Sequence, residues 1–174
     1  MIAGGPRVDA ENTVIALAAR RVRSSVVRLP PTVHSSLDHH GFIPILIAIA
    51  REKGMAAYVG EGANRWPAGH TLDAAHLYRL ALEAAPAGSR LHAVGDEGVP
   101  LRQISEAIGR HLNLPVVSIA PEAATAYFGF LSTPVSMDNP TSSARTRELL
   151  GWEPTHPGLI EDLEQGHYFH TQSA

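Results

Sequence analysis

A chain of 174 residues is long enough to bury one substantial hydrophobic core, and its formal net charge of -3 argues against binding to nucleic acid. The absence of cysteine excludes disulfides, thiolate catalysis and cysteine-based zinc sites. The apolar run 42–50 has about half the length needed to cross a bilayer, and residues 1–7 lack the pattern of a secretory signal. We therefore expect a cytoplasmic protein that does not contact a membrane.

The first predicted helix runs from Asp9 or Ala10 to Arg21, with Asp9 as a plausible N-cap. A short β-branched strand is predicted next, over Ser25–Leu29, because Val26, Val27 and Leu29 form an apolar run that is stopped by two prolines.

A second helix is predicted for Phe42–Lys53, with Gly54 in the left-handed conformation that commonly ends a helix. The order helix, strand, helix is typical of a parallel sheet, whose ligands bind beyond the carboxyl ends of the strands. The loop Pro30–His34 is therefore the segment where we expect function.

The rest of the chain is predicted to alternate short strands with helices, without an interdomain linker, so we expect a single domain, 1–174. The predicted strands are 56–59, 90–94 and 115–119, and the predicted loops are 60–69 and 132–140. One helix is predicted to start at the cap Asp73 and to end before Pro86. The other predicted helices are 100–112, 121–130, 142–150 (closed by Gly151) and 157–168.

Three segments carry a resemblance to a known family. They are Val26–His34 (VVRLPPTVH), Trp66–Ala75 (WPAGHTLDAA) and Glu148–Pro154 (ELLGWEP). In this order they resemble the carboxyl-terminal half of an extended or atypical short-chain dehydrogenase/reductase of the NAD-dependent epimerase/dehydratase family. The resemblance implies an α/β fold that is an incomplete Rossmann-type fold. Residues 1–40 would be the Rossmann-derived portion, with its last strand, and residues 41–174 mainly the substrate-binding lobe.

The resemblance also implies an NAD(P) cofactor and assigns residues to it. The loop after the first strand would lie against the nicotinamide ring, so Pro31, Thr32, Val33 and His34 are the predicted cofactor-binding residues. A main-chain carbonyl or amide there would bind the carboxamide while the prolines hold the loop. The alternative is that the prolines only end a strand.

The predicted substrate-binding residues are Arg65, Trp66 and His70, for a small-molecule substrate. Nucleotide-sugar members of the family carry a phosphate-binding arginine where Trp66 stands here, and Arg65 is displaced by one position, which disfavours a sugar-nucleotide substrate. Trp66 would wall an apolar pocket or pack in the core. Asp73, three residues after His70, is more typical of a helix N-cap than of a catalytic group.

Two parts of the family's machinery are missing from the sequence. Neither 60–65 nor 95–98 fits a glycine-rich phosphate-binding turn. The Tyr-x-x-x-Lys pair is absent, because the only lysine, Lys53, follows Ile49 at that spacing. By position Arg7 and Glu11 would replace the pair, and an arginine cannot donate the tyrosine's proton.

We therefore expect a chain that is not catalytically competent alone, for which a homo-oligomer or a missing amino-terminal half would complete the fold. The alternative function is a non-enzymatic sensor or scaffold that binds a dinucleotide or a partner protein.

The ten histidines raise a metal hypothesis. His34, His39 and His40 lie near Asp38, and a second group, His156, His167 and His170, lies near the end of the chain. Because neither group shows a third ligand at a recognisable spacing, solvated or capping histidines are the favoured interpretation, and no metal site is predicted.

Overall fold

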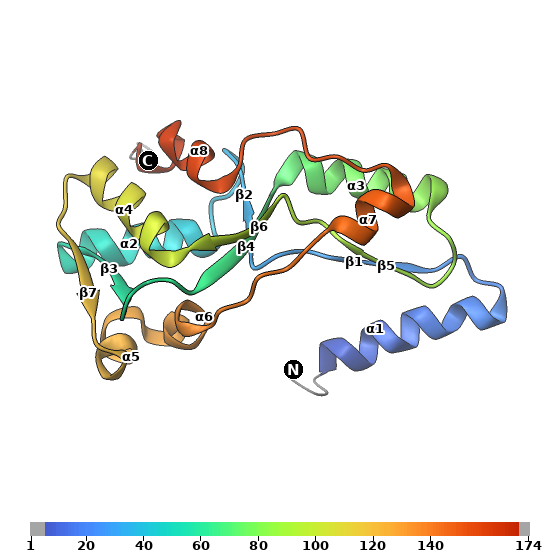
Figure 1. Ribbon diagram of the computed structural model, residues 1–174, viewed down its shortest axis with the longest axis horizontal. Helices are drawn as coiled ribbons and strands as arrows, with labels where there is room; N and C mark the ends of the chain where they lie inside the picture. Colours follow the sequence, from blue (N-terminus) through green and yellow to red (C-terminus); the bar gives the residue numbers. More distant parts are fainter. Residues whose placement is uncertain (1–5, 171–174) are drawn as a thin grey trace.

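The computed structural model describes residues 6–170, and its elements follow one another with short connections (Figure 1). The α-helices are α1 (Pro6–Ala16), α2 (Phe42–Lys53), α3 (Thr71–Ala84), α4 (Leu101–Leu112), α5 (Ala124–Phe128), α6 (Ser132–Ser136), α7 (Ala144–Leu150) and α8 (Leu159–Glu164). The strands are β1 (Ser25–Arg28), β2 (Thr32–His34), β3 (Ala56–Val59), β4 (Arg65–His70), β5 (Ser89–His92), β6 (Asp96–Pro100) and β7 (Val116–Ile119). Short 3-10 helices cover Leu17–Arg20, Pro121–Ala123, Gly129–Leu131 and His167–Phe169.

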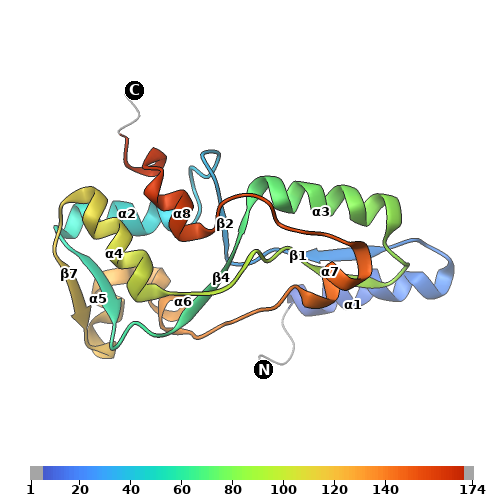
Figure 2. The same ribbon diagram turned by 45° about the horizontal axis from the view of Figure 1, so that its top comes forward.

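The strands form three small sheets. β1 pairs with β5 in parallel, and β3 pairs with β7 in parallel. Between these pairs, β4 is parallel to β2 on one side and antiparallel to β6 on the other. Figures 1 and 2 show the three sheets following one another along the longest axis, with β1–β5 and α3 at one end and β3–β7 and α2 at the other. The mixed α/β architecture agrees with the predicted fold class.

The hydrophobic side chains form two cores. The smaller core joins α3 to β1–β5 and includes Leu77, Leu91 and Trp152, all fully buried. The larger core joins α2, α4, α5, α6 and α8 to β3, β4 and β6. The predicted division into a Rossmann-derived portion, 1–40, and a substrate lobe, 41–174, stays a prediction about function. The cores divide differently, because β5 and α3 lie with β1.

The two cores meet where β1 continues into β2 and β5 into β6. Pro30 is buried at this junction, and the β4 backbone passes close to the β5–β6 connection, where the Gly95 amide donates to the Ala68 carbonyl at 2.9 Å. A Cβ on Gly69 would lie 2.4 Å from the Ala93 carbonyl oxygen. Glycine is therefore required at this crossing, since any side chain would separate the two backbones.

Several predicted elements are confirmed. The helix Phe42–Lys53 has the predicted bounds, and Gly54 and Gly151 both end helices with positive φ, +69° and +61°. The strands 25–29, 56–59, 90–94 and 115–119 lie within one to two residues of their predicted bounds.

Three predicted loops are wrong. Residues 30–34 include β2, residues 132–140 include α6, and residues 60–69 include most of β4. β4 was predicted as a loop because it contains Pro67, and proline is normally excluded from a central strand. Here Pro67 lies at an irregularity in the β4–β6 register between Trp66 and Ala68, which is the position in a sheet that tolerates proline.

Candidate functional site

The predicted functional loop is an edge strand. β2 pairs with β4 on one side and with no other strand within residues 6–170 on its other side, so it is an edge strand. Pro31 is exposed, Val33 is half-buried, and the side chains of Thr32 and His34 are buried. Thr32 and His34 are each 1% exposed as whole residues, so their main chains are buried as well, and the Thr32 hydroxyl has no hydrogen-bond partner among the described residues.

The carboxyl ends of β2 and β4 bring two predicted site residues together. His34 and His70 are register partners, and their rings meet edge to face with centroids 5.5 Å apart. His34 Nδ1 lies 2.9 Å from Asp162 Oδ2, and both side chains are almost fully buried. This pair ties β2 to α8 across 128 positions of sequence. Because an isolated buried carboxylate is costly, the pair is a strong constraint on how α8 docks.

His70 begins α3. Its Nδ1 accepts a hydrogen bond from the Leu72 amide at 3.2 Å, which makes it the N-cap of the helix. The predicted N-cap, Asp73, is therefore wrong, because it is the third residue within the helix. The His70 ring also stacks on that of His156, with centroids 4.6 Å apart and planes 5° apart.

Asp73 instead holds a loop from the far end of the chain. Its buried carboxylate accepts hydrogen bonds from the Thr155 amide at 3.0 Å, the His156 amide at 3.1 Å and His156 Nδ1 at 2.7 Å. Burial raises the pKa of this carboxyl, but the hydrogen bonds from Thr155 and His156 outweigh burial and lower it below its ordinary value. The carboxylate therefore remains ionised and fixes the segment that leads to α8.

Within residues 6–170, the side chains of His70, Asp73 and His156 form one group whose potential metal-ligand atoms lie within 4.8 Å of one another. Each residue of the group already has a structural partner. His70 Nδ1 accepts from Leu72, and Asp73 accepts four donors, among them the Nδ1–H of His156 and, at 3.5 Å, the Thr155 hydroxyl. A neutral His70 that accepts at Nδ1 carries its proton on Nε2, which removes that nitrogen as a ligand. The arrangement therefore fits a hydrogen-bonded junction better than a metal centre.

In each of the two histidine groups considered as metal ligands, members bind different partners. His34 binds Asp162 and not Asp38. Asp38 Oδ1 accepts from the Gly41 amide at 2.8 Å and Oδ2 from the Tyr168 hydroxyl at 3.2 Å, so this carboxylate orders the loop after β2. His167 lies by Asp162, while His156 lies by Asp73.

Arg65 and Trp66 lie at the opposite end of β4 from His70. The Arg65 guanidinium binds both oxygens of Asp138, at 3.0 and 2.8 Å, and its amide donates to the same carboxylate at 2.8 Å. Hydrogen bonds from Arg65 lower the pKa of Asp138 to about 2. Trp66 is 2% exposed, and its indole N–H donates to the Pro134 carbonyl at 2.9 Å. The geometry gives both residues a structural role, and substrate binding by Arg65, Trp66 and His70 stays a prediction.

Arg7 and Glu11 stand where the resemblance places the tyrosine and lysine of the catalytic pair, but Glu11 has a structural role. Its carboxylate binds Arg28 at 2.6 and 2.8 Å and also binds Arg90, which joins α1 to β1 and β5. The Arg7 side chain is exposed. Glu11 therefore anchors a helix.

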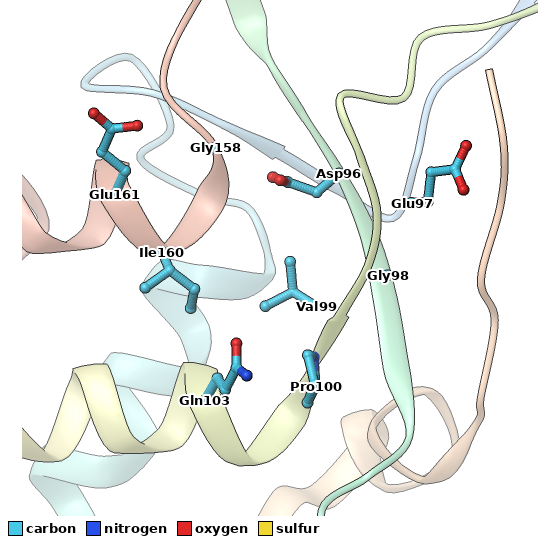
Figure 3. Close-up of a pocket in the computed structure, with 9 residues that line it drawn as sticks. All are labelled: Asp96, Glu97, Gly98, Val99, Pro100, Gln103, Gly158, Ile160 and Glu161. Atoms are coloured by element: carbon cyan, nitrogen blue, oxygen red, sulfur yellow. The ribbon is translucent and has the colours of Figure 1, made fainter. Parts of the chain in front are cut away.

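A pocket of about 580 Å³ lies between β6, α4 and α8 (Figure 3). Two of its carboxylates serve the fold: Asp96 accepts from the Leu159 amide at 2.8 Å, and Glu97 accepts from the Ser142 hydroxyl at 2.5 Å. Figure 3 shows Glu97 directed away from Gln103 and Ile160. These contacts explain both acidic groups without a ligand.

No family model matches the chain. Solved structures with similar folds include an epimerase from Methanothermobacter thermautotrophicus, with a TM-score of 0.71 and 14% identity over 94% of this chain and 48% of that one. The dTDP-glucose 4,6-dehydratase DesIV from Streptomyces venezuelae, solved with NAD bound, has a TM-score of 0.70 and 15% identity over 93% of this chain and 48% of its own. The fold of this chain is similar to that of about half of each of these two enzymes.

A nucleoside-diphosphate-sugar epimerase from Pseudomonas aeruginosa gives the same result, with a TM-score of 0.69 and 17% identity over 97% of this chain and 59% of that one. Sequence relatives are closer. An uncharacterized protein of Schizosaccharomyces pombe is 51% identical over 94% of this chain and 55% of its own length. One from Saccharomyces cerevisiae is 43% identical over 90% and 52%. The chain thus spans about half the length of the curated relatives it matches.

Acid is expected to lower the free energy of unfolding through protonation of His70. Burial lowers the pKa of His70 below its ordinary value of 6.5, and the neighbouring His34 and His156 lower it further, against the opposite effect of Asp162 and Asp73. Because the unfolded chain then binds the proton more readily, the stabilisation is complete above the unfolded pKa and is lost as the pH falls below 6.5 toward the folded pKa.

The test compares urea unfolding of the wild type and His70→Asn between pH 7.5 and 5.5. Asparagine keeps an N-cap acceptor and removes the titrating ring, so the variant should lose less stability over this range than the wild type. His76→Asn, which changes a half-buried histidine within α3, is the matched control. Equal pH slopes for the wild type and His70→Asn would contradict the assignment.

Proposed function

We propose that this chain is the substrate-side half of an NAD(P)-dependent oxidoreductase of the epimerase/dehydratase type, and that it acts together with the rest of a longer polypeptide. The observation that carries the proposal is the position of β2 as the edge strand of its sheet, directly after β1 of the parallel β1–β5 pair, in a fold similar to that of a dehydratase solved with NAD bound. Of residues 31–34 at this edge, Pro31 and Val33 keep exposed surface, and their main-chain groups would bind the nicotinamide end of the cofactor.

The proposed substrate is a small molecule that is not held by a phosphate contact at Arg65. That guanidinium already satisfies Asp138 through two hydrogen bonds, and the pair would have to separate before a phosphate could bind. The preference for a substrate without a diphosphate therefore differs from what the names of the similar structures would suggest.

A second candidate function is a sensor or scaffold that binds a dinucleotide without turning it over. The observation that favours it is the role of Glu11, which binds Arg28 and Arg90 and so is not free to replace the lysine of a catalytic pair. The part of the chain from residue 6 to 170 contains no helix both long and apolar enough to span a bilayer.

The test is a calorimetric titration of NADH and NADPH into two proteins, this chain and the full-length Schizosaccharomyces pombe relative. We expect the longer protein to bind at least one dinucleotide and this chain alone to bind about 100-fold more weakly, since only part of the cofactor would be contacted. Hydride turnover, followed by nicotinamide absorbance over a panel of carbonyl compounds, would favour the enzyme, and binding without turnover would favour the sensor. The absence of dinucleotide binding by both proteins would overturn both proposals.

A further inference from the structure

A basic pocket of about 920 Å³ lies between β1, β5 and α7, and it includes Arg28, Arg90, His92, Arg145 and Glu148 among its lining residues. Figures 1 and 2 show α7 beside β5, on the side away from α2 and the β3–β7 pair. We propose that this pocket binds a phosphate-bearing small molecule. The inference does not depend on the function proposed above, because it uses other residues and needs no dinucleotide.

The first argument is a charge that the fold leaves uncompensated. Arg28 and Arg90 share a single carboxylate, that of Glu11, and their side chains are 47% and 40% exposed. Hydrogen bonds from Arg28 lower the pKa of Glu11 despite the opposing effect of burial, so the carboxylate is ionised. Its single negative charge faces the two positive charges of the guanidiniums. The other polar partner of Arg90 is the neutral amide of Asn12. One positive charge therefore remains at the pocket.

The second argument is that the donors are held in place. An arginine can only donate, so Arg28 Nη1, 3.3 Å from His92 Nε2, donates to that nitrogen. His92 must then carry its proton on Nδ1, which donates to the Ser142 carbonyl at 3.1 Å. The chain Glu11, Arg28, His92 and Ser142 fixes the guanidinium while each of its terminal nitrogens keeps a second N–H. A preoriented guanidinium is well suited to a phosphate.

The third argument concerns α7. Arg145 is exposed at the pocket, and none of the hydrogen bonds or ion pairs within residues 6–170 satisfies its guanidinium. Leu149, 47% exposed, adds an apolar wall. The volume lies within the range of small-molecule sites and exceeds what a phosphate ion alone would fill, so an ester with an organic group is the best fit. The overall charge of -3 disfavours a long polyanion such as nucleic acid.

The experiment uses two probes, inorganic phosphate and phenyl phosphate, titrated into the full chain and followed by amide chemical shifts. Saturable shifts are expected at Gly88, Ser142 and Thr146, with phenyl phosphate binding more tightly than phosphate. Arg145→Gln should weaken phenyl phosphate binding about tenfold, and Glu148→Gln should strengthen it about threefold, because the two changes alter the charge of one pocket in opposite directions.

Arg102→Gln is the matched control, since Arg102 is exposed and pairs with Glu106 on α4, away from the pocket. It should leave binding unchanged. Non-saturable shifts, equal weakening by Arg102→Gln and Arg145→Gln, or weaker binding by Glu148→Gln would each overturn the proposal. Both α7 substitutions are at exposed positions, so wild-type melting curves should be retained.

Discussion

Replacement of Asp73 by alanine is expected to lower the free energy of unfolding by about 3 kcal/mol, because it removes the acceptor of four hydrogen bonds at a buried carboxylate. The amides of Thr155 and His156 and the His156 ring would all lose their partner. The expected structural result is release of the segment that carries the chain from Trp152 to α8. Urea unfolding at pH 7 measures the loss, and faster amide exchange at Thr155 and His156 locates it.

The pH dependence adds a second check on Asp73. Because its pKa in the folded protein lies below the ordinary 3.8, its stabilising contribution is present above pH 3.8 and is lost as the pH falls through the folded pKa. The difference between wild type and Asp73→Ala should therefore shrink in strong acid. Asp9→Ala, at an exposed position on α1, should change stability by about 0.5 kcal/mol or less at pH 7. Equal effects of the two substitutions would contradict the assigned role of Asp73.

Replacement of Trp66 by alanine is expected to cost about 3–5 kcal/mol, the usual penalty for emptying the site of a buried aromatic side chain. Trp66 is 2% exposed, its ring packs on Phe42 with centroids 5.5 Å apart, and its N–H satisfies the Pro134 carbonyl. Trp66→Phe keeps most of the packing and loses the hydrogen bond, so a cost of about 1–2 kcal/mol is expected. Thermal and urea unfolding provide the measurement.

Phe130→Ala is the control for an aromatic side chain outside the core, since Phe130 is 73% exposed, and it should cost about 0.5 kcal/mol or less. The comparison also separates the two interpretations of Trp66 made from the sequence. A small cost for Trp66→Ala would indicate that the side chain walls a pocket instead of filling the core.

The sequence by itself determined the local elements that carry their own signals. The bounds of α2 follow from Gly41 before it and Gly54 after it, and β1 follows from a β-branched run ended by prolines. These signals act over a few residues and do not need the rest of the fold. The family resemblance likewise indicated an incomplete Rossmann-type α/β fold, and the similar solved structures confirm the fold class.

Tertiary structure alone decided the pairings that make the candidate site. The sequence did not predict β4, because proline is tolerated in a strand only where the register is irregular. The irregularity at Pro67 lies in the pairing of β4 with β6. The sequence predicted Asp73 as the N-cap, whereas its carboxylate binds Thr155 and His156 of a loop more than eighty residues away, and the local cap is His70. The partner of His34, Asp162, had no sequence signal at all. Contacts of this kind depend on strand register and helix docking, which no short-range pattern encodes, and so they appear only when the chain is folded.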